Sequence, residues 1–219
     1  MDPYYQDDQV TLYHGDCLKI TEWLDADVLV TDPPYGMSYE SNFNRDKRNS
    51  KVGRSVAGDS DTDIRDAALE LWGDRPALVF GRWNVPMPPS VVARLVWDRG
   101  YHGMGDLSFP WGPSDEEIYV LGRGFIGKRE PNVIRVHGLM SGDRNRPNHP
   151  TPKPIPLMER LIQNCPTGTI ADPFSGSGST LLAARNLGRK AIGVEEVERY
   201  CELVAKRLDQ MCLDFGEGA

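Results

Sequence analysis

The sequence predicts an α/β fold with a mainly parallel sheet, and three observations support this prediction. Short β-branched or aliphatic runs alternate along the chain with segments whose apolar residues recur at helical spacing. A glycine-rich turn at 172–180 lies where one of these runs ends and a helical segment begins. With 22 glycines and 17 prolines among 219 residues, we expect short regular elements joined by long loops.

Seven strands are expected, each a short β-branched or aliphatic run bounded by turn residues. The clearest is 27–31, in which a run dominated by β-branched residues is stopped by Pro33 and Pro34. The segment 91–97 fits either a strand or a helix. In chain order, the seven predicted strands are 10–13, 27–31, 77–80, 117–121, 133–136, 169–171 and 190–194.

Four helices are expected between and after these strands. Residues 61–72 predict a helix because the apolar residues at 64, 67, 68 and 71 share one helical face. Residues 156–164 begin with a proline, which the first turn of a helix tolerates. The remaining two helices, 179–187 and 197–211, follow the glycine-rich turn and the last predicted strand.

Length and composition fit one soluble domain that spans residues 1–219 and carries large loops. Hydrophobic residues make up 39% of the chain, and no apolar run approaches the roughly 18 residues of a membrane span. The acidic start at 1–8 has no apolar segment behind it, so we expect a protein that is not exported. The four cysteines and four histidines lack the spacing of a zinc site or a disulfide framework, so we expect cytoplasmic localisation and no bound metal.

Charge is unevenly distributed along the chain. The net charge of −7 by itself argues against a polyanionic partner. However, 41–54 holds five cations and one acid, and 123–153 holds seven cations and two acids, so these segments carry +4 and +5. The rest of the chain then carries −16, and the two basic segments become candidates for contacts with an anionic partner.

The glycine-rich turn and a later carboxylate together predict a nucleoside cofactor. Gly176 and Gly178 remove side chains from the turn, so a ligand can approach the backbone, and Ser179 can cap the following helix. Glu195 stands nineteen residues after Gly176, at a strand end where a carboxylate can accept hydrogen bonds from both ribose hydroxyls. The pattern leaves a nicotinamide dinucleotide and S-adenosylmethionine open, although Leu181 replaces the third glycine of the dinucleotide fingerprint.

A second motif, Asp32-Pro-Pro-Tyr-Gly36, directly follows the predicted strand at 27–31. In an open parallel sheet this position is the carboxyl edge, where ligands bind. The Asp32 carboxylate and the Pro33 carbonyl are both acceptors, and they suit the two hydrogens of an exocyclic amine on a planar base. Holding both hydrogens favours a tetrahedral nitrogen with a usable lone pair, while Tyr35 can stack on the base.

These motifs resemble those of the DNA amino-methyltransferases. The segment that begins at Asp32 is similar to their catalytic motif, and 172–178 is similar to their cofactor motif, Asp-x-Phe-x-Gly-x-Gly. Because the catalytic motif comes first, the order resembles that of the permuted β group of N6-adenine and N4-cytosine enzymes. His149-Pro-Thr-Pro-Lys-Pro154 also has a counterpart in that group, usually with glutamine where this chain has Pro152. The resemblance covers residues 12–207.

The resemblance implies a fold, a cofactor and a set of site residues. The implied fold is the Rossmann-like class I methyltransferase fold, circularly permuted, with a mainly parallel seven-stranded sheet and helices on both faces. The implied cofactor is S-adenosylmethionine. The implied catalytic residues are Asp32, Pro33, Pro34 and Tyr35, and the implied cofactor-binding residues are Asp16, Cys17, Asp32, Thr151, Lys153, Pro154, Asp172, Phe174, Gly176, Ser177, Gly178, Ser179 and Glu195.

The permuted order also accounts for the amino terminus. In the unpermuted fold, the helix after the strand that carries Glu195 leads into another strand and an acid that contacts the cofactor. Here the chain ends at that helix, and the missing piece resembles the strand at 10–13 followed by Asp16. The resemblance therefore implies that Asp16 meets the adenine amine of the cofactor, with Cys17 beside it.

The resemblance also implies the substrate. Aspartate at the first position of the catalytic motif is the common form in N6-adenine enzymes, whereas N4-cytosine enzymes more often carry serine, so we expect methyl transfer to adenine N6. The alternative is N4-cytosine, whose amine is also conjugated. Either base has to be flipped out of duplex DNA. The loops expected to contact DNA are 36–60 and 123–150, and the first carries Arg45, Lys47, Arg48, Lys51 and Arg54.

Two other classes of function remain open from the sequence. A non-catalytic nucleic-acid-binding subunit would keep the fold without turnover. A nicotinamide oxidoreductase would use the glycine-rich turn but leave the motif at Asp32 without a role. A homodimer is implied by the resemblance alone, and 219 residues leave no room for a separate recognition domain, so we expect a short or relaxed target, or one read by two subunits.

Overall fold

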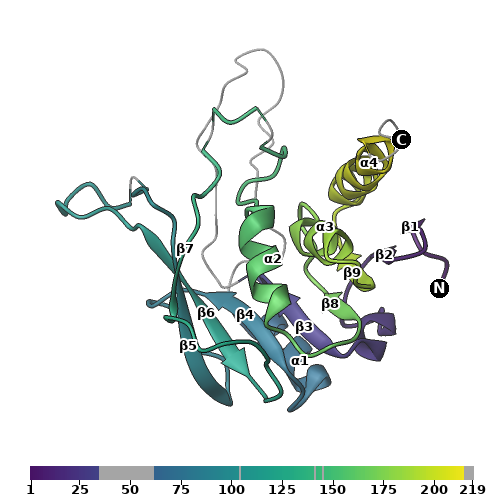
Figure 1. Cartoon of the computed structure of the whole chain (residues 1–219), viewed down its shortest axis with the longest axis horizontal. Helices are drawn as coiled ribbons and strands as arrows, with labels where there is room; N and C mark the ends of the chain where they lie inside the picture. Colours follow the sequence, from purple (N-terminus) through teal and green to yellow (C-terminus); the bar gives the residue numbers. More distant parts are fainter. Residues whose placement is uncertain (35–61, 104, 141, 145, 215–219) are drawn as a thin grey trace.

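The structure is a computed structural model that describes residues 1–34, 62–103, 105–140, 142–144 and 146–214. Within these ranges, nine strands form one sheet in the order β1-β2-β9-β8-β3-β4-β6-β5-β7 (Figure 1). The strands are β1 (Tyr5–Gln6), β2 (Val10–His14), β3 (Val28–Thr31), β4 (Ala77–Gly81), β5 (Val91–Asp98), β6 (Asp115–Leu121), β7 (Val133–Arg135), β8 (Ile170–Asp172) and β9 (Ala191–Glu195). The helices are η1 (Glu22–Asp25, a 3₁₀ helix), α1 (Asp63–Trp72), α2 (Ile155–Gln163), α3 (Ser179–Asn186) and α4 (Glu198–Asp214).

The sheet is mainly parallel, as predicted. Strands β2, β9, β8, β3 and β4 pair in parallel at its centre, and β5 and β7 pair in parallel at one edge. Strand β6 runs antiparallel between β4 and β5, and β1 is antiparallel to β2 at the other edge. Strand β5 therefore points the same way as β4, so the loop from β5 to β6 leaves the sheet at the edge where the parallel strands have their carboxyl ends.

All seven predicted strands are present. The sheet has nine strands within the described residues, so the predicted number of seven is wrong. The ambiguous segment 91–97 belongs to β5. It forms a strand because it pairs with β6 on one side and with β7 on the other, and this pairing cannot be recognised from the periodicity of the segment itself. Strand β1 adds two further residues to the sheet. The Asp7 carboxylate orders the turn after it by accepting hydrogen bonds from the N–H groups of Gln9 and Val10, at 2.8 and 2.7 Å. Two residues are too few to show the alternation that predicts a strand.

The four predicted helices are present, and sequence punctuation explains their ends. Helix α1 stops at Gly73, whose φ of 72° breaks the helical path, and α3 starts after Gly178 at φ 77°. Pro154 precedes α2, and a proline occupies its first turn. The 3₁₀ helix η1 was not predicted. None of the helices in the described ranges is both long and apolar enough to cross a membrane.

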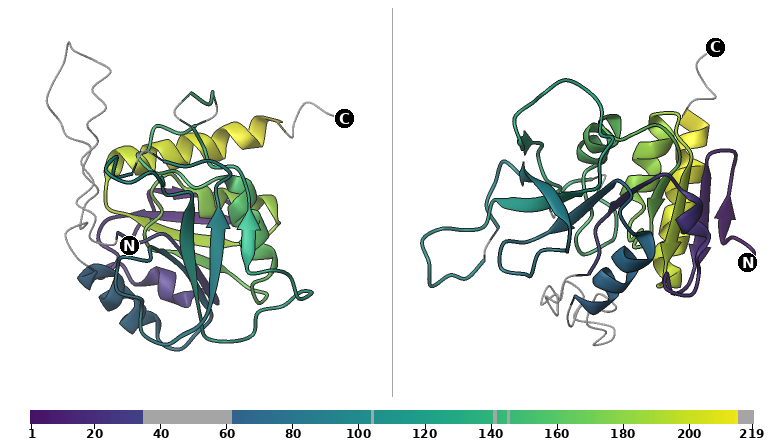
Figure 2. Two further views of the ribbon diagram at one scale, coloured as in Figure 1. Left: turned by 90° about the vertical axis from the view of Figure 1, so that its left-hand side faces the viewer. Right: turned by 90° about the horizontal axis from the view of Figure 1, so that it is seen from below.

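Helices cover both faces of the sheet, as predicted (Figure 2). Val28 and Val30 of β3 belong to the core cluster that also contains residues of α2, α3 and α4. Leu29, between them, belongs to the cluster on the other face, with Trp23 of η1 and Trp72 of α1. Because successive side chains of a strand point to opposite faces, this three-residue run contributes to both layers.

Strand β2, near the amino terminus, lies beside β9, the last strand of the sheet in chain order, as the resemblance implied. Residues 10–14 of β2 pair in parallel register with residues 191–195 of β9. Beyond the strand, the Gly15 N–H donates to the Glu195 carbonyl at 2.9 Å. The residues after β2 therefore reach the same edge of the sheet as Glu195.

Replacing Trp23 with alanine tests the packing of the second face. The Trp23 ring is fully buried, stacks on Trp72 with ring centroids 5.8 Å apart, and donates from its indole N–H to the Cys17 carbonyl at 2.9 Å. We expect Trp23→Ala to lower the free energy of unfolding by about 3–5 kcal/mol, measured by denaturant titration. Leu71→Ala, at an exposed position of α1, is the control and should change it by under about 0.5 kcal/mol. A loss for Trp23→Ala no larger than the control's would contradict this account.

Candidate active site

Four strand ends converge on one cavity at the carboxyl edge of the sheet. Asp16 follows β2, Asp32 follows β3, Asp172 ends β8 and Glu195 ends β9. All four acids line a cavity of about 770 Å³, a size typical of small-molecule sites. Because these strands are parallel, their carboxyl ends meet at one edge, and this brings together acids that are far apart in the sequence.

The glycine-rich turn needs both of its glycines, for different neighbours. Gly176 has a φ of 50°, and a Cβ there would lie 3.1 Å from Nε2 of His149. Gly178 has a φ of 77°, and a Cβ there would lie 2.8 Å from the Val204 methyl groups of α4. Gly176 thus keeps the turn open toward the cavity, whereas Gly178 allows α3 to start against α4.

Glu195 is a buried carboxylate that the turn itself holds in place. Its Oε2 accepts the Gly176 N–H at 2.7 Å and its Oε1 accepts the Val197 N–H at 2.8 Å. Burial raises the pKa of Glu195 to about 7, even though both backbone hydrogen bonds favour the charged form. Each carboxylate oxygen has a second lone pair, so both oxygens can still accept from a ligand hydroxyl.

Asp172 connects two strand ends beneath the turn. Its Oδ1 accepts a hydrogen bond from the Thr31 hydroxyl at 2.7 Å and from the Phe174 N–H at 3.2 Å. The side chain is buried, and burial raises its pKa to about 6. Because Thr31 directly precedes Asp32, this contact ties the glycine-rich turn to the Asp32 motif.

Buried hydroxyls tie the same turn to the motif at 149–154. The Oγ atoms of Ser177 and Ser179 share a hydrogen bond at 3.2 Å, and Ser179 donates to the Lys153 carbonyl at 2.7 Å. Both serines are buried, so water does not compete for these contacts. The two motifs that the resemblance implied for the cofactor therefore form one hydrogen-bonded unit.

The Lys153 ammonium lies against two carboxylates rather than in open solvent. It donates a short hydrogen bond to Oδ2 of Asp32 and lies 3.2 Å from Oε2 of Glu116 on β6. It also lies 4.8 Å from the centre of the Phe80 ring. The Lys153 side chain is only 6% exposed, so it depends on these partners for its charge. The structure thus places Lys153 on the implied catalytic aspartate.

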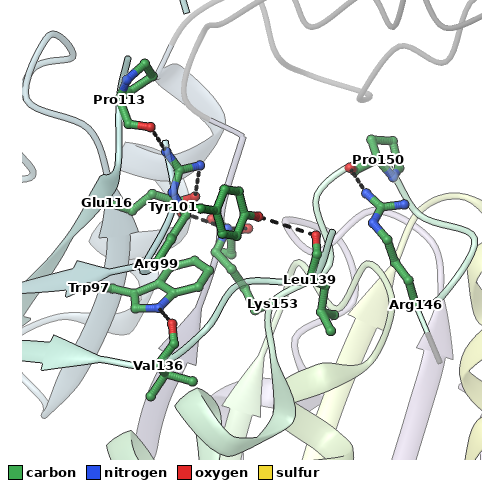
Figure 3. A network of polar contacts seen from close by, with 11 residues as sticks. Trp97, Arg99, Tyr101, Pro113, Glu116, Val136, Leu139, Arg146, Pro150 and Lys153 are labelled. Atoms are coloured by element: carbon green, nitrogen blue, oxygen red, sulfur yellow. Dashed lines mark hydrogen bonds and ion pairs between the residues drawn. The ribbon is translucent and has the colours of Figure 1, made fainter. Parts of the chain in front are cut away.

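The polar network continues from Glu116 to the loop between β5 and β6 (Figure 3). Arg99 lies 3.7 Å from Glu116 through Nη1 and donates from Nη2 to the Pro113 carbonyl at 2.6 Å. Its guanidinium is 5.8 Å from the centre of the Tyr101 ring. Tyr101 in turn donates to the Leu139 carbonyl at 3.4 Å. A chain of contacts therefore runs from Asp32 through Lys153 and Glu116 to the base of this loop.

His149 faces the glycine-rich turn as a neutral ring. Burial, reinforced by Lys153, Arg146 and other nearby cations, lowers the pKa of His149 to about 3. Its ring packs edge-on against Tyr200 with centroids 4.6 Å apart, and its Nδ1 accepts from the Thr151 N–H at 3.3 Å. A ring that stays uncharged adds no further positive charge to this side of the cavity.

Most of the sequence-predicted residues meet at the cavity. Asp16 and Cys17 line it, with the Asp16 carboxylate accepting the Leu18 N–H at 2.9 Å. Pro154 and Gly178 are not among the described residues that line it and instead start α2 and α3. Tyr35 and the cations Arg45, Lys47, Arg48, Lys51 and Arg54 lie outside the described residues. The remaining predicted residues that line the cavity are Asp32, Pro33, Pro34, Thr151, Lys153, Asp172, Phe174, Gly176, Ser177, Ser179 and Glu195.

Sequence reasoning missed Glu116, Arg99 and His149 as site residues. Glu116 and Arg99 come from β6 and the loop after β5, whose pairing partners the sequence did not reveal. His149 begins the motif at 149–154, in which the resemblance implies a role only for the threonine, the lysine and the last proline. Its position beside Gly176 depends on the fold. Among the described residues, no group of three or more His, Cys, Asp and Glu side chains is placed to hold a metal ion.

Some cations of the second basic segment, 123–153, contact other groups of the protein. Of its seven cations, Lys153 pairs with the cavity acids and Arg135 pairs with Asp98 at 2.7 Å. Arg146 lines the cavity and donates to the Pro150 carbonyl at 2.6 Å. The exposed cations are Arg135, whose side chain is 77% exposed, and Arg123, Lys128, Arg129 and Arg144.

The fold and the cavity define an α/β protein with a small-molecule site at the carboxyl edge of a parallel sheet, and similarity to known proteins makes this class specific. A family model for DNA methylases, of the N6/N4 type, matches residues 90–206. YubD of Escherichia coli (strain K12) is 30% identical over 225 residues, which cover 94% of this chain and 92% of YubD. The chain therefore belongs to the N6/N4 DNA methylase family, and the predicted class of enzyme, a DNA methyltransferase that uses S-adenosylmethionine, is confirmed.

Further relatives are DNA methyltransferases by name, and solved structures share the fold. Type II methyltransferase M.ScaI of Streptomyces caespitosus is 27% identical over 94% of this chain and 84% of its own length. DNA adenine methyltransferase YhdJ of Escherichia coli (strain K12) is 42% identical over 64 residues, which are 28% of this chain and 22% of YhdJ. The crystal structure of an M1.HpyAVI complex with S-adenosylmethionine covers 91% of this chain at a TM-score of 0.64 and 20% identity, with 99% of that chain covered. The cytosine-N4-specific PvuII DNA methyltransferase covers 93% at a TM-score of 0.64 and 16% identity, with 87% of that chain covered.

A Lys153→Met variant separates the two roles that sequence and structure suggest for this lysine. Without the ammonium, Asp32 and Glu116 lose their shared cation, so we expect kcat for methyl transfer to fall while the dissociation constant of S-adenosylmethionine changes less than about threefold. The free energy of unfolding should fall by about 3 kcal/mol, because uncompensated carboxylates remain partly buried.

The matched control for this variant is Lys206→Met. Lys206 pairs with Glu202 on the exposed surface of α4, so its loss should cost about 0.5 kcal/mol or less. Calorimetry gives the cofactor affinity, and single-turnover kinetics give the rate. A large loss of cofactor affinity at an unchanged rate would return Lys153 to the cofactor-binding role that the sequence implied.

Proposed function

We propose that this protein transfers a methyl group from S-adenosylmethionine to the N6 amine of an adenine that is flipped out of duplex DNA. The observation that carries the proposal is the convergence of Asp32, Gly176 and Glu195 on one cavity. Each comes from the end of a different parallel strand, so the fold itself sets the distance between the donor site and the acceptor site.

The residues of the cavity fit the donor. Glu195 presents two carboxylate oxygens beside an open glycine turn, which is the arrangement that two ribose hydroxyls require. Asp16 lies on the neighbouring strand end and offers an acceptor for the adenine amine of the donor. The Cys17 thiol beside it is buried, and its pKa is raised to about 12, so it stays uncharged.

Methyl transfer then depends on alignment. When bound, S-adenosylmethionine supplies a methyl group on a positively charged sulfur, which leaves with the electron pair of the broken carbon–sulfur bond. Asp32 and the Pro33 carbonyl would accept the two amine hydrogens and so leave the nitrogen lone pair available to form the new bond to the methyl group. Asp32 then takes up the amine proton or passes it to water, and Lys153 holds the Asp32 carboxylate in the orientation that this step requires.

Two observations favour adenine over cytosine as the acceptor. The first position of the catalytic motif is Asp32 rather than serine. YhdJ, a relative that is 42% identical over 28% of this chain, is named as a DNA adenine methyltransferase. N4-cytosine transfer is the alternative, since a structure of the same fold is named as cytosine-N4-specific.

The DNA contacts of this proposal lie in the basic segments. We assign the phosphate contacts to the exposed cations Arg123, Lys128, Arg129 and Arg144, and to the basic residues of 36–60 predicted from the sequence. The whole chain acts as one methyltransferase domain. The proposed target is short or relaxed, or read jointly by two copies.

A product analysis tests the reaction. The pure protein is incubated with labelled S-adenosylmethionine and unmethylated DNA, and the digested nucleosides are identified by mass spectrometry. We expect N6-methyladenine. We also expect Asp32→Ala to keep its affinity for S-adenosylmethionine and to lose transfer by about 100-fold or more, because the proton acceptor and the orienting group disappear together.

Asp74→Ala is the matched control, since Asp74 is exposed on the loop after α1 and should leave the rate unchanged. N4-methylcytosine as the product would replace the proposed base by the alternative. If no DNA at any salt concentration were methylated, the proposal would fail.

The pH dependence of cofactor affinity tests the role of Glu195. Its pKa of about 7 in the ligand-free protein means that the carboxylate is mostly charged at pH 8 and mostly protonated at pH 6. Ribose hydroxyls donate to the charged form, so binding favours loss of the proton. We therefore expect the affinity for S-adenosylmethionine to fall about tenfold from pH 8 to pH 6.

Glu195→Gln is the control for this measurement because its amide does not titrate. Titration of the cofactor itself is common to both proteins, and Asp172, whose pKa is raised to about 6, is present in both, so the steeper loss of affinity expected in the wild type reports on the Glu195 side chain. Calorimetry at four pH values gives both curves. The same slope in the variant as in the wild type would show that Glu195 does not bind the ribose.

A further inference from the structure

The loop between β5 and β6 carries large apolar side chains that face water. Leu107, Phe109 and Trp111 are 81%, 63% and 79% exposed. They stand within five residues of one another and share the segment with Pro110. Single exposed apolar residues are ordinary, but a cluster at the end of one loop marks a site that another molecule covers.

The loop is built to hold these side chains outward. Its two arms are joined by hydrogen bonds from the Arg99 N–H to the Ser114 carbonyl at 2.9 Å and from the Gly103 N–H to the Pro113 carbonyl at 2.7 Å. A Cβ at Gly112 would lie 2.4 Å from the Gly103 carbonyl oxygen, so the arms approach as closely as a glycine allows. Within the tip, the Asp106 carboxylate accepts the Ser108 N–H at 2.9 Å.

The position of the loop connects it to the proposed reaction. It leaves the sheet at the carboxyl edge, beyond the pairing of Asp98 with Asp115, and Figure 1 shows it projecting away from α3 and α4. Gly103, Gly105 and Pro113 of the loop line the cavity that holds Asp32. Arg99 at its base contacts Glu116, which contacts Lys153 (Figure 3). The apolar tip therefore stands beside the place where the proposed target base enters.

The chemistry of the tip favours bases over phosphates. Residues 105–112 contain no lysine or arginine and one acid, Asp106, so they offer nothing that attracts a phosphate. Leucine, phenylalanine and proline are the residue types that proteins insert between base steps, and tryptophan offers a planar ring that stacks on bases.

A second copy of this chain is a poorer partner for the tip. Each buried aromatic side chain contributes about 150–250 Å², so two aromatic residues and one leucine do not reach the roughly 800 Å² per partner of a stable interface. DNA, which is held by contacts elsewhere on the protein as well, needs only a small apolar insertion at this place.

We propose that the tip formed by Leu107, Phe109 and Trp111 enters the DNA beside the target nucleotide and replaces the stacking that the base loses when it is flipped out. This inference rests on the proposed function. Flipping costs a few kcal/mol of stacking and pairing, least for a base that is already unpaired. An inserted apolar side chain keeps the neighbouring bases in contact with a flat surface and closes the gap against the return of the base.

A double variant, Phe109→Ala with Trp111→Ala, tests the insertion. The substrate is a duplex that the wild-type protein methylates, prepared once with the target base paired and once with it mispaired. We expect the variant to bind the paired duplex about tenfold or more weakly, and to methylate it correspondingly more slowly at low DNA concentration. On the mispaired duplex most of this deficit should disappear, because extrusion then costs less.

Two further readouts distinguish insertion from other roles. The affinity for S-adenosylmethionine should be unchanged, since neither ring lines the cavity among the described residues. The slope of DNA affinity against salt concentration should also be unchanged, because no phosphate contact is removed. The matched control is Leu71→Ala with Val92→Ala, which removes exposed apolar side chains 45% and 56% accessible on α1 and β5, away from the cavity, and should bind both duplexes like the wild type.

The outcomes separate this inference from the proposed function. An active wild type with a variant that equals it, or that loses the same factor on paired and mispaired duplexes, would overturn the insertion while leaving the methyl transfer intact. A changed salt slope, or a change of oligomeric state in sedimentation without a change in DNA affinity, would also overturn it. A wild-type protein that methylates no DNA would instead refute the proposed function.

Discussion

The arrangement of the site depends on the ion pairs of one buried cation, Lys153. Lys153 is almost fully buried, and an ammonium group in that environment is stable only when carboxylates or other acceptors surround it. Its partners come from two different strand ends, Asp32 after β3 and Glu116 on β6. Its own carbonyl accepts the hydroxyl of Ser179 at the start of α3. The Asp32 motif, the segment at 149–154 and the glycine-rich turn therefore have to assemble together, since Lys153 loses a contact if any of them moves.

Burial and pairing of charged side chains also determine which ligands the cavity favours. Its lining contains more acids than cations, and several of these charges are committed to one another or to backbone N–H groups. Burial raises the pKa values of Glu195 and Asp172, so their charged forms are costly until hydrogen-bond donors approach them. A ligand that brings hydroxyls and a positive sulfur relieves this cost. The buried carboxylates of the cavity, which are poorly solvated in the folded chain, therefore suit the hydroxyls and the positive charge of S-adenosylmethionine.

The sequence was sufficient for the strands and for most of the residues at the cavity, and insufficient where pairing across the sheet decides the outcome. Short β-branched or aliphatic runs predict β3 and β9, and the spacing of the motifs places Asp32 and Glu195 at the ends of these strands. Lys153 could be found from its motif, but its partner could not, because Glu116 lies on an antiparallel strand whose register no local pattern specifies. For the same reason the two-residue β1 was missed and β5 stayed ambiguous. Local patterns show where an element lies, whereas the contacts between elements determine which side chains meet.

The number of cations in a basic segment is larger than the number that is free to contact DNA phosphates. The segment 123–153 carries seven cations, yet Lys153 and Arg146 are held by acids or carbonyl groups at the cavity, and the exposed Arg135 pairs with Asp98. Only the exposed cations of the segment can exchange counterions for phosphates. Within this segment, the electrostatic attraction to DNA is therefore limited to these exposed cations, and contacts that carry no charge add to it. The proposed insertion of the apolar tip between β5 and β6, beside the cavity, is a contact of this kind, at the nucleotide where selectivity for the target is needed.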